Sequence, residues 1–241
     1  MLHFVRRGCA VFMLIIAGGA MDVAATPIVS GGGTATCVLG PGTGAAPNTP
    51  CALQAITPHS LWQPNLPAIA GYGGVWVSYA NTGVGGNTLA PQAGSTLNPT
   101  GRASIMDVSE TFNLSNGGAL DLYVWADDTA DVFLDNVLQI AANFSQNVCA
   151  NGSIGCEPGE YFHLNTLLGT GNHALTLRAY QTGSGTTPSS NPFGLLYSGN
   201  VTGNALSQNL SVPAPDALVL MLTGLAGLLW RRSAGRAHSG D

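Results

Sequence analysis

Acidic side chains gather in one short stretch of the chain, where their spacing could support metal chemistry. Seven of the twelve acids lie between Asp107 and Asp135, and the densest group is Asp127, Asp128, Asp131 and Asp135. Calcium takes about six to eight oxygen ligands, which carboxylates and backbone carbonyls of a turn can supply. Aspartate also favours turns, because its side chain hydrogen-bonds the local backbone. The four residues therefore predict either a calcium site or a polar turn without metal.

Aromatic side chains in the same region could stack on a sugar ring. Tyr123 and Trp125 alternate with the aliphatic positions of one predicted strand, and Phe133 does so in the next strand. Aromatic rings offer saccharides a flat apolar face. A register shift of one residue would turn the same rings into the core. Tyr123, Trp125 and Phe133 are thus predicted either as glycan contacts or as core residues.

Motifs for catalysis are weak throughout the chain. His59, His163 and His173 stand apart, without the paired spacing of a metal site. The sequence has no Gly-x-Ser-x-Gly elbow and no lysine. Glu157 and Glu160 could form the carboxylate pair of a glycosidase, but they stand beside a predicted disulfide loop in a short turn. We expect a non-catalytic protein with no certain cofactor, calcium being the alternative.

The charge balance of the chain excludes one class of partner. Charged residues make up only 8% of the sequence. Residues 26–211 contain two basic side chains, Arg102 and Arg178, against nine acids. Nucleic-acid binding needs a basic footprint, so we expect no nucleic acid as a partner. Neutral glycans and a divalent cation remain compatible with this composition.

Four cysteines form two close pairs, in which Cys37 precedes Cys51 and Cys149 precedes Cys156. Each pair brackets a short loop rich in Gly, Asn or Pro. In an oxidising compartment this spacing predicts the disulfides Cys37–Cys51 and Cys149–Cys156, with four free thiols as the alternative.

The N-terminal residues 1–25 predict a cleavable export signal. Arg6 and Arg7 precede an apolar stretch that is too short and too glycine-rich for a comfortable membrane span. Small residues lead up to Ala25, after which we place the cleavage site. Such a signal helix would deliver the chain to the export translocon.

The C-terminus predicts a short transmembrane helix over residues 216–230. Its apolar run from Ala217 to Trp230 has 14 residues. As a helix this run measures about 21 Å, against about 30 Å of hydrocarbon, so the anchor is marginal. Arg231 and Arg232 follow the run and favour a cytoplasmic C-terminus with the body outside.

This tail resembles a known sorting signal. The residues Val212-Pro213-Ala214-Pro215, the apolar helix and Arg231-Arg232 look like the PEP-CTERM signal of Gram-negative bacteria, although Ala214 stands where the family motif has Glu. The resemblance implies processing by an exosortase-like membrane protease and a host that makes extracellular polysaccharide. It also implies inner-membrane anchoring in transit through the cell envelope, followed by the cell surface or the extracellular space.

Between the two signals the sequence predicts an all-β body. Residues 26–70 show no sustained periodicity and are expected to form an irregular leader. Residues 71–211 contain short alternating segments separated by Gly, Asn and Pro, typical of an antiparallel β-sandwich with a jelly-roll-like arrangement. The sorting tail occupies residues 212–241.

The body also resembles galactose-binding-like and related glycan-binding sandwiches. The resemblance rests on the segment from Trp125 to Asn136 and on Gly171-Asn-His-Ala-Leu-Thr-Leu177. It implies a sandwich fold and extracellular polysaccharide as a partner. We therefore expect an exported, non-catalytic protein of the cell surface or extracellular matrix, with a secreted polysaccharide hydrolase or a purely structural matrix protein as alternatives.

Overall fold

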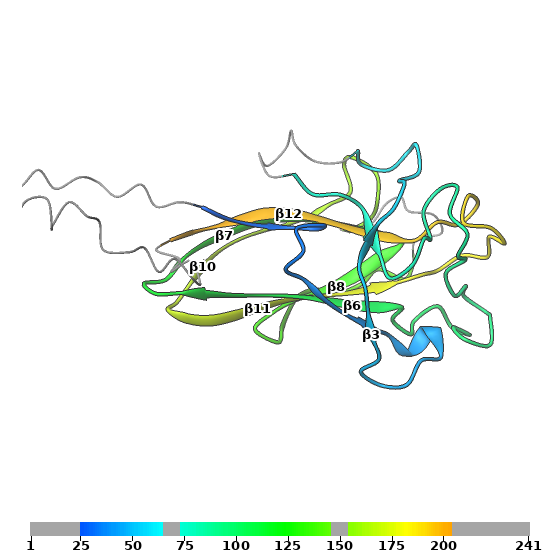
Figure 1. The fold of residues 1–241 in the computed structure, drawn as a ribbon, viewed down its shortest axis with the longest axis horizontal. Helices are drawn as coiled ribbons and strands as arrows, with labels where there is room; N and C mark the ends of the chain where they lie inside the picture. Colours follow the sequence, from blue (N-terminus) through cyan, green and yellow to red (C-terminus); the bar gives the residue numbers. More distant parts are fainter. Residues whose placement is uncertain (1–24, 65–72, 146–153, 204–241) are drawn as a thin grey trace, which may run out of the picture. The chain divides into compact units, whose positions relative to one another are not determined.

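The computed structural model of the chain describes residues 25–64, 73–145 and 154–203. All of them belong to the first of two units into which the chain divides, Met1–Ala205 and Leu206–Asp241. The described residues form twelve β-strands and one short 3-10 turn, η1 (Pro41–Thr43). Figure 1 shows that the strands lie in two layers.

Both sheets are antiparallel and contain six strands each. The first sheet has the order β10-β7-β12-β5-β4, and β1 also pairs with β12. Its strands are β1 (Thr26–Val29), β4 (Gln54–Ala55), β5 (Val77–Ser78), β7 (Gly118–Asp127), β10 (Phe162–Leu168) and β12 (Gly194–Gly203). The second sheet has the order β3-β2-β6-β11-β8-β9. Its strands are β2 (Thr36–Leu39), β3 (Pro50–Cys51), β6 (Met106–Leu114), β8 (Thr129–Leu134), β9 (Val137–Ile140) and β11 (Gly171–Tyr180).

The core lies between the two sheets and follows the alternation of the sequence. Leu120, Leu122 and Val124 of β7 point inward and are fully buried. Leu175 and Leu177 of β11 face them from the second sheet within the same apolar cluster. Successive side chains of a strand point to opposite faces, so an alternating segment buries one face completely. The predicted antiparallel β-sandwich is confirmed.

The segment expected to be an irregular leader contributes to both sheets. Its strand β1 pairs with β12 over four residues, from Thr26 opposite Val201 to Val29 opposite Ser198. The strand β2 pairs with β6 in the second sheet. These leader strands have two to four residues each, which is too short for a period of two to stand out in the sequence.

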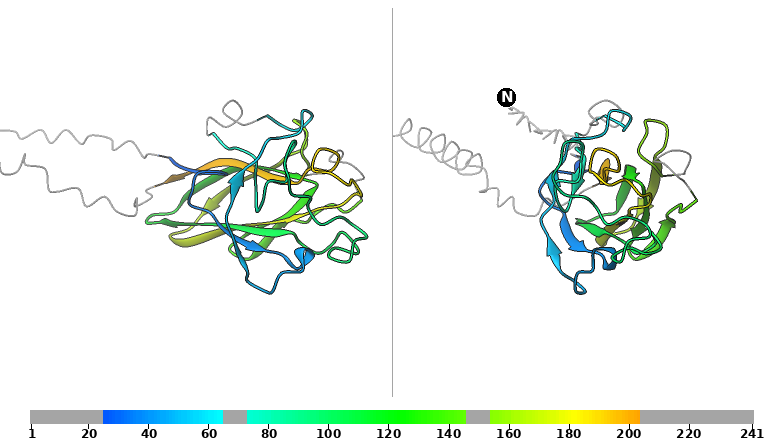
Figure 2. Two further views of the ribbon diagram at one scale, coloured as in Figure 1. Left: turned by 45° about the vertical axis from the view of Figure 1, so that its right-hand side comes forward. Right: turned by 90° about the vertical axis from the view of Figure 1, so that its right-hand side faces the viewer.

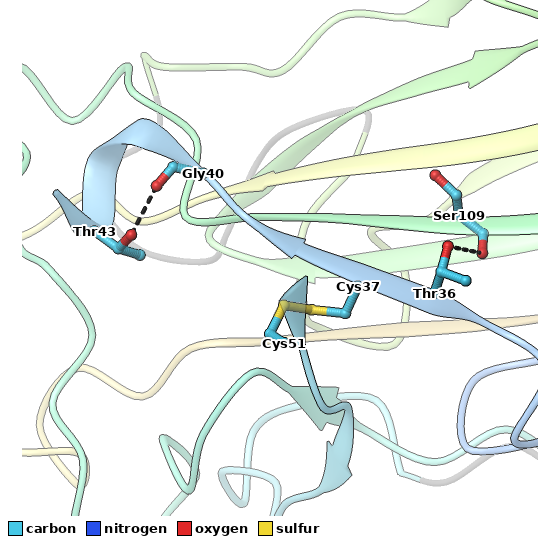
Figure 3. The surroundings of a disulfide bond; sticks show 6 residues. All are labelled: Thr36, Cys37, Gly40, Thr43, Cys51 and Ser109. Atoms are coloured by element: carbon cyan, nitrogen blue, oxygen red, sulfur yellow. Dashed lines mark hydrogen bonds between the residues drawn. A yellow bond between two sulfur atoms is a disulfide. The ribbon is translucent and has the colours of Figure 1, made fainter. Parts of the chain in front are cut away.

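One predicted disulfide is confirmed, and it joins two strands of the leader. Cys37 of β2 and Cys51 of β3 are paired residues in the sheet, and their sulfur atoms are bonded with the Cα atoms 5.0 Å apart (Figure 3). Nearby, the Thr36 hydroxyl donates to the carbonyl of Ser109 at 3.3 Å. Cys156 is also disulfide-bonded, whereas its predicted partner Cys149 lies outside the described residues.

A polar contact crosses the apolar core. The hydroxyl of Tyr197, on β12, donates to Oε1 of Glu110, on β6, at 2.8 Å, and both side chains are buried. Burial raises the pKa of the Tyr197 hydroxyl, and the neighbouring Glu110 raises it further. Because the two strands belong to different sheets, this hydrogen bond joins the two layers.

The predicted terminal segments lie outside the described residues. These are the signal helix in residues 1–24 and the tail with its sorting motif Val212, Pro213, Ala214, Pro215, Arg231 and Arg232. Ala25, the predicted cleavage residue, is exposed and directly precedes β1. Within the part of the chain that the structure describes, no helix has the length and apolarity needed to cross a bilayer.

Candidate functional site

A cleft opens among loops at one end of the sandwich; we call it the loop-end cleft. Its floor lies where the chain leaves β7 and passes to β8 in the other sheet, at Asp127 and Asp128. The loop 181–193 between β11 and β12, yellow in Figures 1 and 2, supplies one side. The segment 59–62 and Glu157 supply the rest of the wall. The cleft has a volume of about 300 Å³.

Two buried carboxyl groups form the floor. Asp127 and Asp128 are each 4% exposed, and their side chains hydrogen-bond to each other. The indole N–H of Trp62 donates to Asp127, and the backbone N–H of Thr182 donates to Oδ2 of Asp128. Burial raises the pKa of Asp127 well above its ordinary value, and the charge of Asp128 raises it further. Burial raises the pKa of Asp128 as well, whereas the hydrogen bonds from Thr182 and Asp127 lower it. In the contact between the two carboxyl groups, Asp127 is thus the donor and Asp128 the acceptor.

The apolar side of the cleft is rigid. The ring of Trp62 packs at 4.2 Å, between centroids, against that of Trp76, whose indole N–H donates to the carbonyl of Gln63 at 2.8 Å. The backbone N–H of Trp62 donates to the carbonyl of His59 at 3.0 Å and closes a turn. Leu61, within this turn, is 62% exposed. An exposed aliphatic side chain thus stands at the rim of a fixed aromatic wall.

The opposite rim is polar and is held by its own side chains. The hydroxyls of Thr187 and Ser190 lie 3.1 Å apart, and Nδ2 of Asn191 donates to the carbonyl of Thr182 at 3.1 Å. Gly185 is required for close approach, since a Cβ there would come within 2.4 Å of the Cβ of Asn191. These contacts place hydroxyl and amide groups of the loop at the opening.

The arrangement favours a neutral ligand rich in hydroxyl groups. Its polar groups include the Asp128 carboxylate as an acceptor and serine hydroxyls that both donate and accept. The side chains that line it include no arginine. An apolar wall with a few fixed polar groups is the usual composition of a small-molecule site. The carboxyl groups of Asp127 and Asp128 hydrogen-bond to each other. They therefore lie closer together than the two carboxyl groups of a retaining glycosidase, which are about 5 Å apart.

The four acids predicted as calcium ligands do not form one site. Asp127 and Asp128 lie in the cleft, Asp131 lies within β8, and Asp135 lies in the turn after β8. The seven residue steps from Asp128 to Asp135 would span about 23 Å in an extended strand. Across the described ranges, no three His, Cys, Asp or Glu side chains are grouped so as to hold a metal ion. The structure therefore does not bring the four acids together, and each has its own neighbours.

Asp131 and Asp135 each have a protein partner. The hydroxyl of Tyr180 donates to Oδ2 of Asp131 at 2.5 Å. Oδ2 of Asp135 lies 2.8 Å from Nδ1 of His173. Burial alone would raise the pKa of Asp135, but the hydrogen bond with His173 lowers it. Asp135 and Asn136 both have positive φ, 52° and 64°, which is the geometry of a tight hairpin turn. The turn interpretation therefore fits Asp135, whereas Asp131 lies within a strand.

The three aromatic residues predicted as glycan contacts do not share a surface. Trp125 is 0% exposed and packs with Trp62, Trp76 and other residues in a second apolar cluster. Tyr123, half-buried, packs against that cluster, whereas Phe133 belongs to β8 in the other sheet. The predicted platform is therefore corrected. The outward register of Tyr123 and Trp125 is as expected, but the leader covers the Trp125 ring.

Tyr123 belongs to an aromatic group on the outside of the first sheet. Its ring stacks at 4.2 Å on His163 and lies 5.3 Å from Tyr161. Nε2 of His163 lies 2.6 Å from Oδ1 of Asp121. Phe133, by contrast, lies 5.3 Å from the guanidinium of Arg178. Each ring is thus engaged with neighbours of its own sheet.

Sequence reasoning missed most of the cleft. Neither Trp62 nor the polar run 183–191 was predicted as part of a site. Its Gly, Ser, Thr and Asn residues are a signal for a long functional loop, because such residues combine backbone freedom with hydrogen-bonding groups. Glu157 lines the cleft, and its backbone N–H donates to Oε2 of Glu160 at 3.4 Å.

Comparisons with known proteins give weak structural likenesses. No protein family matches the sequence, and no curated protein does. Among solved structures, a family 35 carbohydrate binding module from Clostridium thermocellum matches with a TM-score of 0.33 and 10% identity, over 74% of this chain and 99% of that one. A Paenibacillus sp. cycloisomaltooligosaccharide glucanotransferase matches with a TM-score of 0.30 and 12% identity, over 76% of this chain and 19% of that one. Both TM-scores lie below 0.5, so neither likeness supports a conclusion about function.

Proposed function

We propose that the protein binds a neutral saccharide in the loop-end cleft and does so without catalysis. The observation that carries this proposal is the buried Asp127–Asp128 pair beside the wall of Trp62 and Leu61. A carboxylate fixed next to an apolar surface supports recognition of a molecule that has both hydroxyl groups and C–H faces.

The proposed binding mode divides the ligand between the two sides of the cleft. A C–H face of the sugar packs on Leu61, which is 62% exposed, beside the buried ring of Trp62. A sugar hydroxyl donates to the Asp128 carboxylate, and further hydroxyls meet Ser190 at the rim. Hydrogen bonds to an ionised acceptor are stronger than those between neutral groups, so Asp128 fixes the orientation of the sugar. The volume of about 300 Å³ suits a short saccharide unit.

Affinity electrophoresis of the full chain through gels containing neutral polysaccharides tests this proposal. We expect at least one neutral polysaccharide to retard the protein. The Leu61→Ala variant should lose most of that retardation, because its side chain is 62% exposed at the rim and its removal takes away apolar contact area. Leu167→Ala is the matched control, since Leu167 is 85% exposed on β10, away from the cleft.

Two outcomes would overturn the proposal. One is equal retardation of the Leu61→Ala variant and the wild-type chain. The other is the absence of retardation by every neutral polysaccharide of a broad panel. Measurement of the thermal unfolding of both variants shows that the substitutions leave the fold intact.

We further propose that the chain is exported and sorted by its PEP-CTERM-like tail to the cell surface or the extracellular matrix. The disulfide Cys37–Cys51 supports an oxidising destination, because such bonds persist mainly outside the cytosol. Mass spectrometry of the mature protein from its host tests both terminal signals. We expect an N-terminus at Thr26 and loss of the residues that follow the sorting motif. A mature chain that begins at Met1 contradicts export, and one that ends at Asp241 contradicts processing of the tail.

A further inference from the structure

The two arginines of the described residues lie in one cavity, separate from the loop-end cleft. Arg102 and Arg178 both line a space of about 480 Å³ at the outer face of the second sheet; we call it the arginine cavity. The chain has no lysine, so these are the only lysine or arginine side chains in residues 25–64, 73–145 and 154–203. The positive charge of the described body is thus concentrated at one place.

Arg178 forms a fixed part of this cavity. Its Nε donates to both carboxylate oxygens of Asp107, at 3.2 Å and 3.0 Å, and its Nη2 lies 3.0 Å from Oδ2. The ring of Phe133 lies 5.3 Å from the guanidinium carbon and holds it from one side. Burial would lower the pKa of Arg178, but Asp107 raises it. The Asp107 carboxylate neutralises this cation and keeps it in position.

Arg102 differs because its charge has an aromatic neighbour only. Its guanidinium carbon lies 5.5 Å from the centroid of the Phe144 ring, and Phe144 in turn packs edge-on against Tyr180 at 5.0 Å. Among the described residues it forms no ion pair with a carboxylate. Arg102 is exposed, so its donors are directed to solvent or to a ligand. A planar guanidinium is the side chain best suited to a bidentate contact with a carboxylate.

We propose that the arginine cavity binds a sugar acid, with its carboxylate on Arg102. The remaining lining groups fit the hydroxyls of such a ligand, since Ser104 and Asn48 can donate and accept and Asp107 can accept. Val38 and Pro41 supply apolar surface for the C–H groups of the ring. This proposal does not depend on the proposed function of the cleft. The cleft has a carboxylate floor and receives neutral sugars, whereas the arginine cavity selects for negative charge.

Isothermal titration calorimetry of the full chain with D-glucuronate, D-glucose and acetate tests the proposal at low ionic strength. We expect D-glucuronate to bind at least about tenfold more tightly than D-glucose or acetate. The Arg102→Gln variant should lose this preference, and Arg102→Lys should recover only part of it, because lysine keeps the charge without the planar fork. Added salt should weaken glucuronate binding to the wild-type chain.

The controls separate this site from the cleft. Leu167→Ala should bind D-glucuronate as the wild type does, and Leu61→Ala should also retain it while losing neutral polysaccharide. Equal affinities for D-glucuronate and D-glucose in the wild type overturn the proposal, as does unchanged glucuronate binding in Arg102→Gln. Acetate that binds as tightly as D-glucuronate overturns the sugar part. Loss of glucuronate binding in Leu61→Ala would move the ligand to the cleft and would also contradict the proposal.

Discussion

The floor of the loop-end cleft consists of two buried carboxyl groups, those of Asp127 and Asp128. Burial and the charge of Asp128 both raise the pKa of Asp127. The same chain also has an aspartate with the opposite behaviour. The pKa of Asp135 would be raised by burial but is lowered by its hydrogen bond with His173. The surroundings of each aspartate, and not the residue type, therefore decide whether its pKa is raised or lowered.

This contrast predicts opposite pH dependences for two Asp→Asn variants. The folded-state pKa of Asp127 lies above its ordinary value of 3.8, so its stabilising effect is complete below that value and is lost as the pH rises through the raised pKa. Asparagine has no proton to lose. We expect Asp127→Asn to gain free energy of unfolding relative to the wild type as the pH rises from about 4 to about 8.

Asp135→Asn is the control with the opposite sign. Because the pKa of Asp135 is lowered, its stabilising effect is present above 3.8 and is lost as the pH falls. This variant should be less stable than the wild type at neutral pH, and the difference should shrink in acid. Urea denaturation across the pH range measures both. A stability difference for Asp127→Asn that stays constant with pH would show that Asp127 is ionised in the folded state.

At the scale of elements, two strands of different sheets meet through a polar contact inside an apolar core. Glu110 on β6 accepts the hydrogen bond of Tyr197 on β12 at 2.8 Å. A buried carboxyl group that loses its partner retains the cost of leaving water, which amounts to about 1–3 kcal/mol. The contact therefore specifies how β6 and β12 face each other as well as stabilising them.

Removal of the Tyr197 hydroxyl tests this link. We expect Tyr197→Phe to lower the free energy of unfolding by about 1–3 kcal/mol, because Glu110 loses its donor while the ring volume stays the same. Tyr161→Phe is the control, since Tyr161 is 39% exposed. Chemical denaturation at neutral pH measures both variants. Equal stability losses in the two variants would mean that the Glu110–Tyr197 hydrogen bond contributes no more to stability than the hydroxyl of Tyr161 does.

The long strands could be predicted from the sequence, and the short ones could not. β7 and β11 have ten residues each, so their alternation is visible in the sequence, and the structure buries Leu122 and Leu177 on one face of each strand. β3, β4 and β5 have two residues each and show no period. Their pairing depends on partners that are distant in sequence, such as Val77 with Leu195. Local sequence carries no information of that kind.

The candidate site shows the same limit. The sequence showed the acidic stretch but not how its members are divided. They lie in the cleft, on β8 and in a hairpin turn, because the chain crosses from one sheet to the other at Asp127 and Asp128. Trp125 was predicted either as a glycan contact or as a core residue, and it is buried in an apolar cluster that includes Trp62 and Trp76. Trp62 contributes to the cleft only because residues 59–62 return to the end of the sandwich. Each of these outcomes is set by tertiary contacts.

At the scale of the whole molecule, the described body has few charges, and it separates them. Carboxyl groups without an arginine line the loop-end cleft, and both arginines line the arginine cavity, where Asp107 pairs with Arg178 and leaves the charge of Arg102 in excess. Such a division supports two ligands of different charge on one sandwich, a neutral saccharide and a sugar acid. It also fits a chain in which only 8% of residues are charged, since the rest of the surface offers little competition for either ligand.

The central claim is that a neutral saccharide binds in the loop-end cleft, and the indole N–H signals of the tryptophans test it most directly. The chain has four tryptophans, so these signals are few in a ¹⁵N-correlated NMR spectrum and can be assigned by substitution. The signal of Trp62, whose N–H donates to Asp127, should move during titration with a neutral oligosaccharide derived from a retarding polysaccharide. The signal of Trp125, which is 0% exposed, should move far less. A stationary Trp62 signal under saturating oligosaccharide would contradict the account.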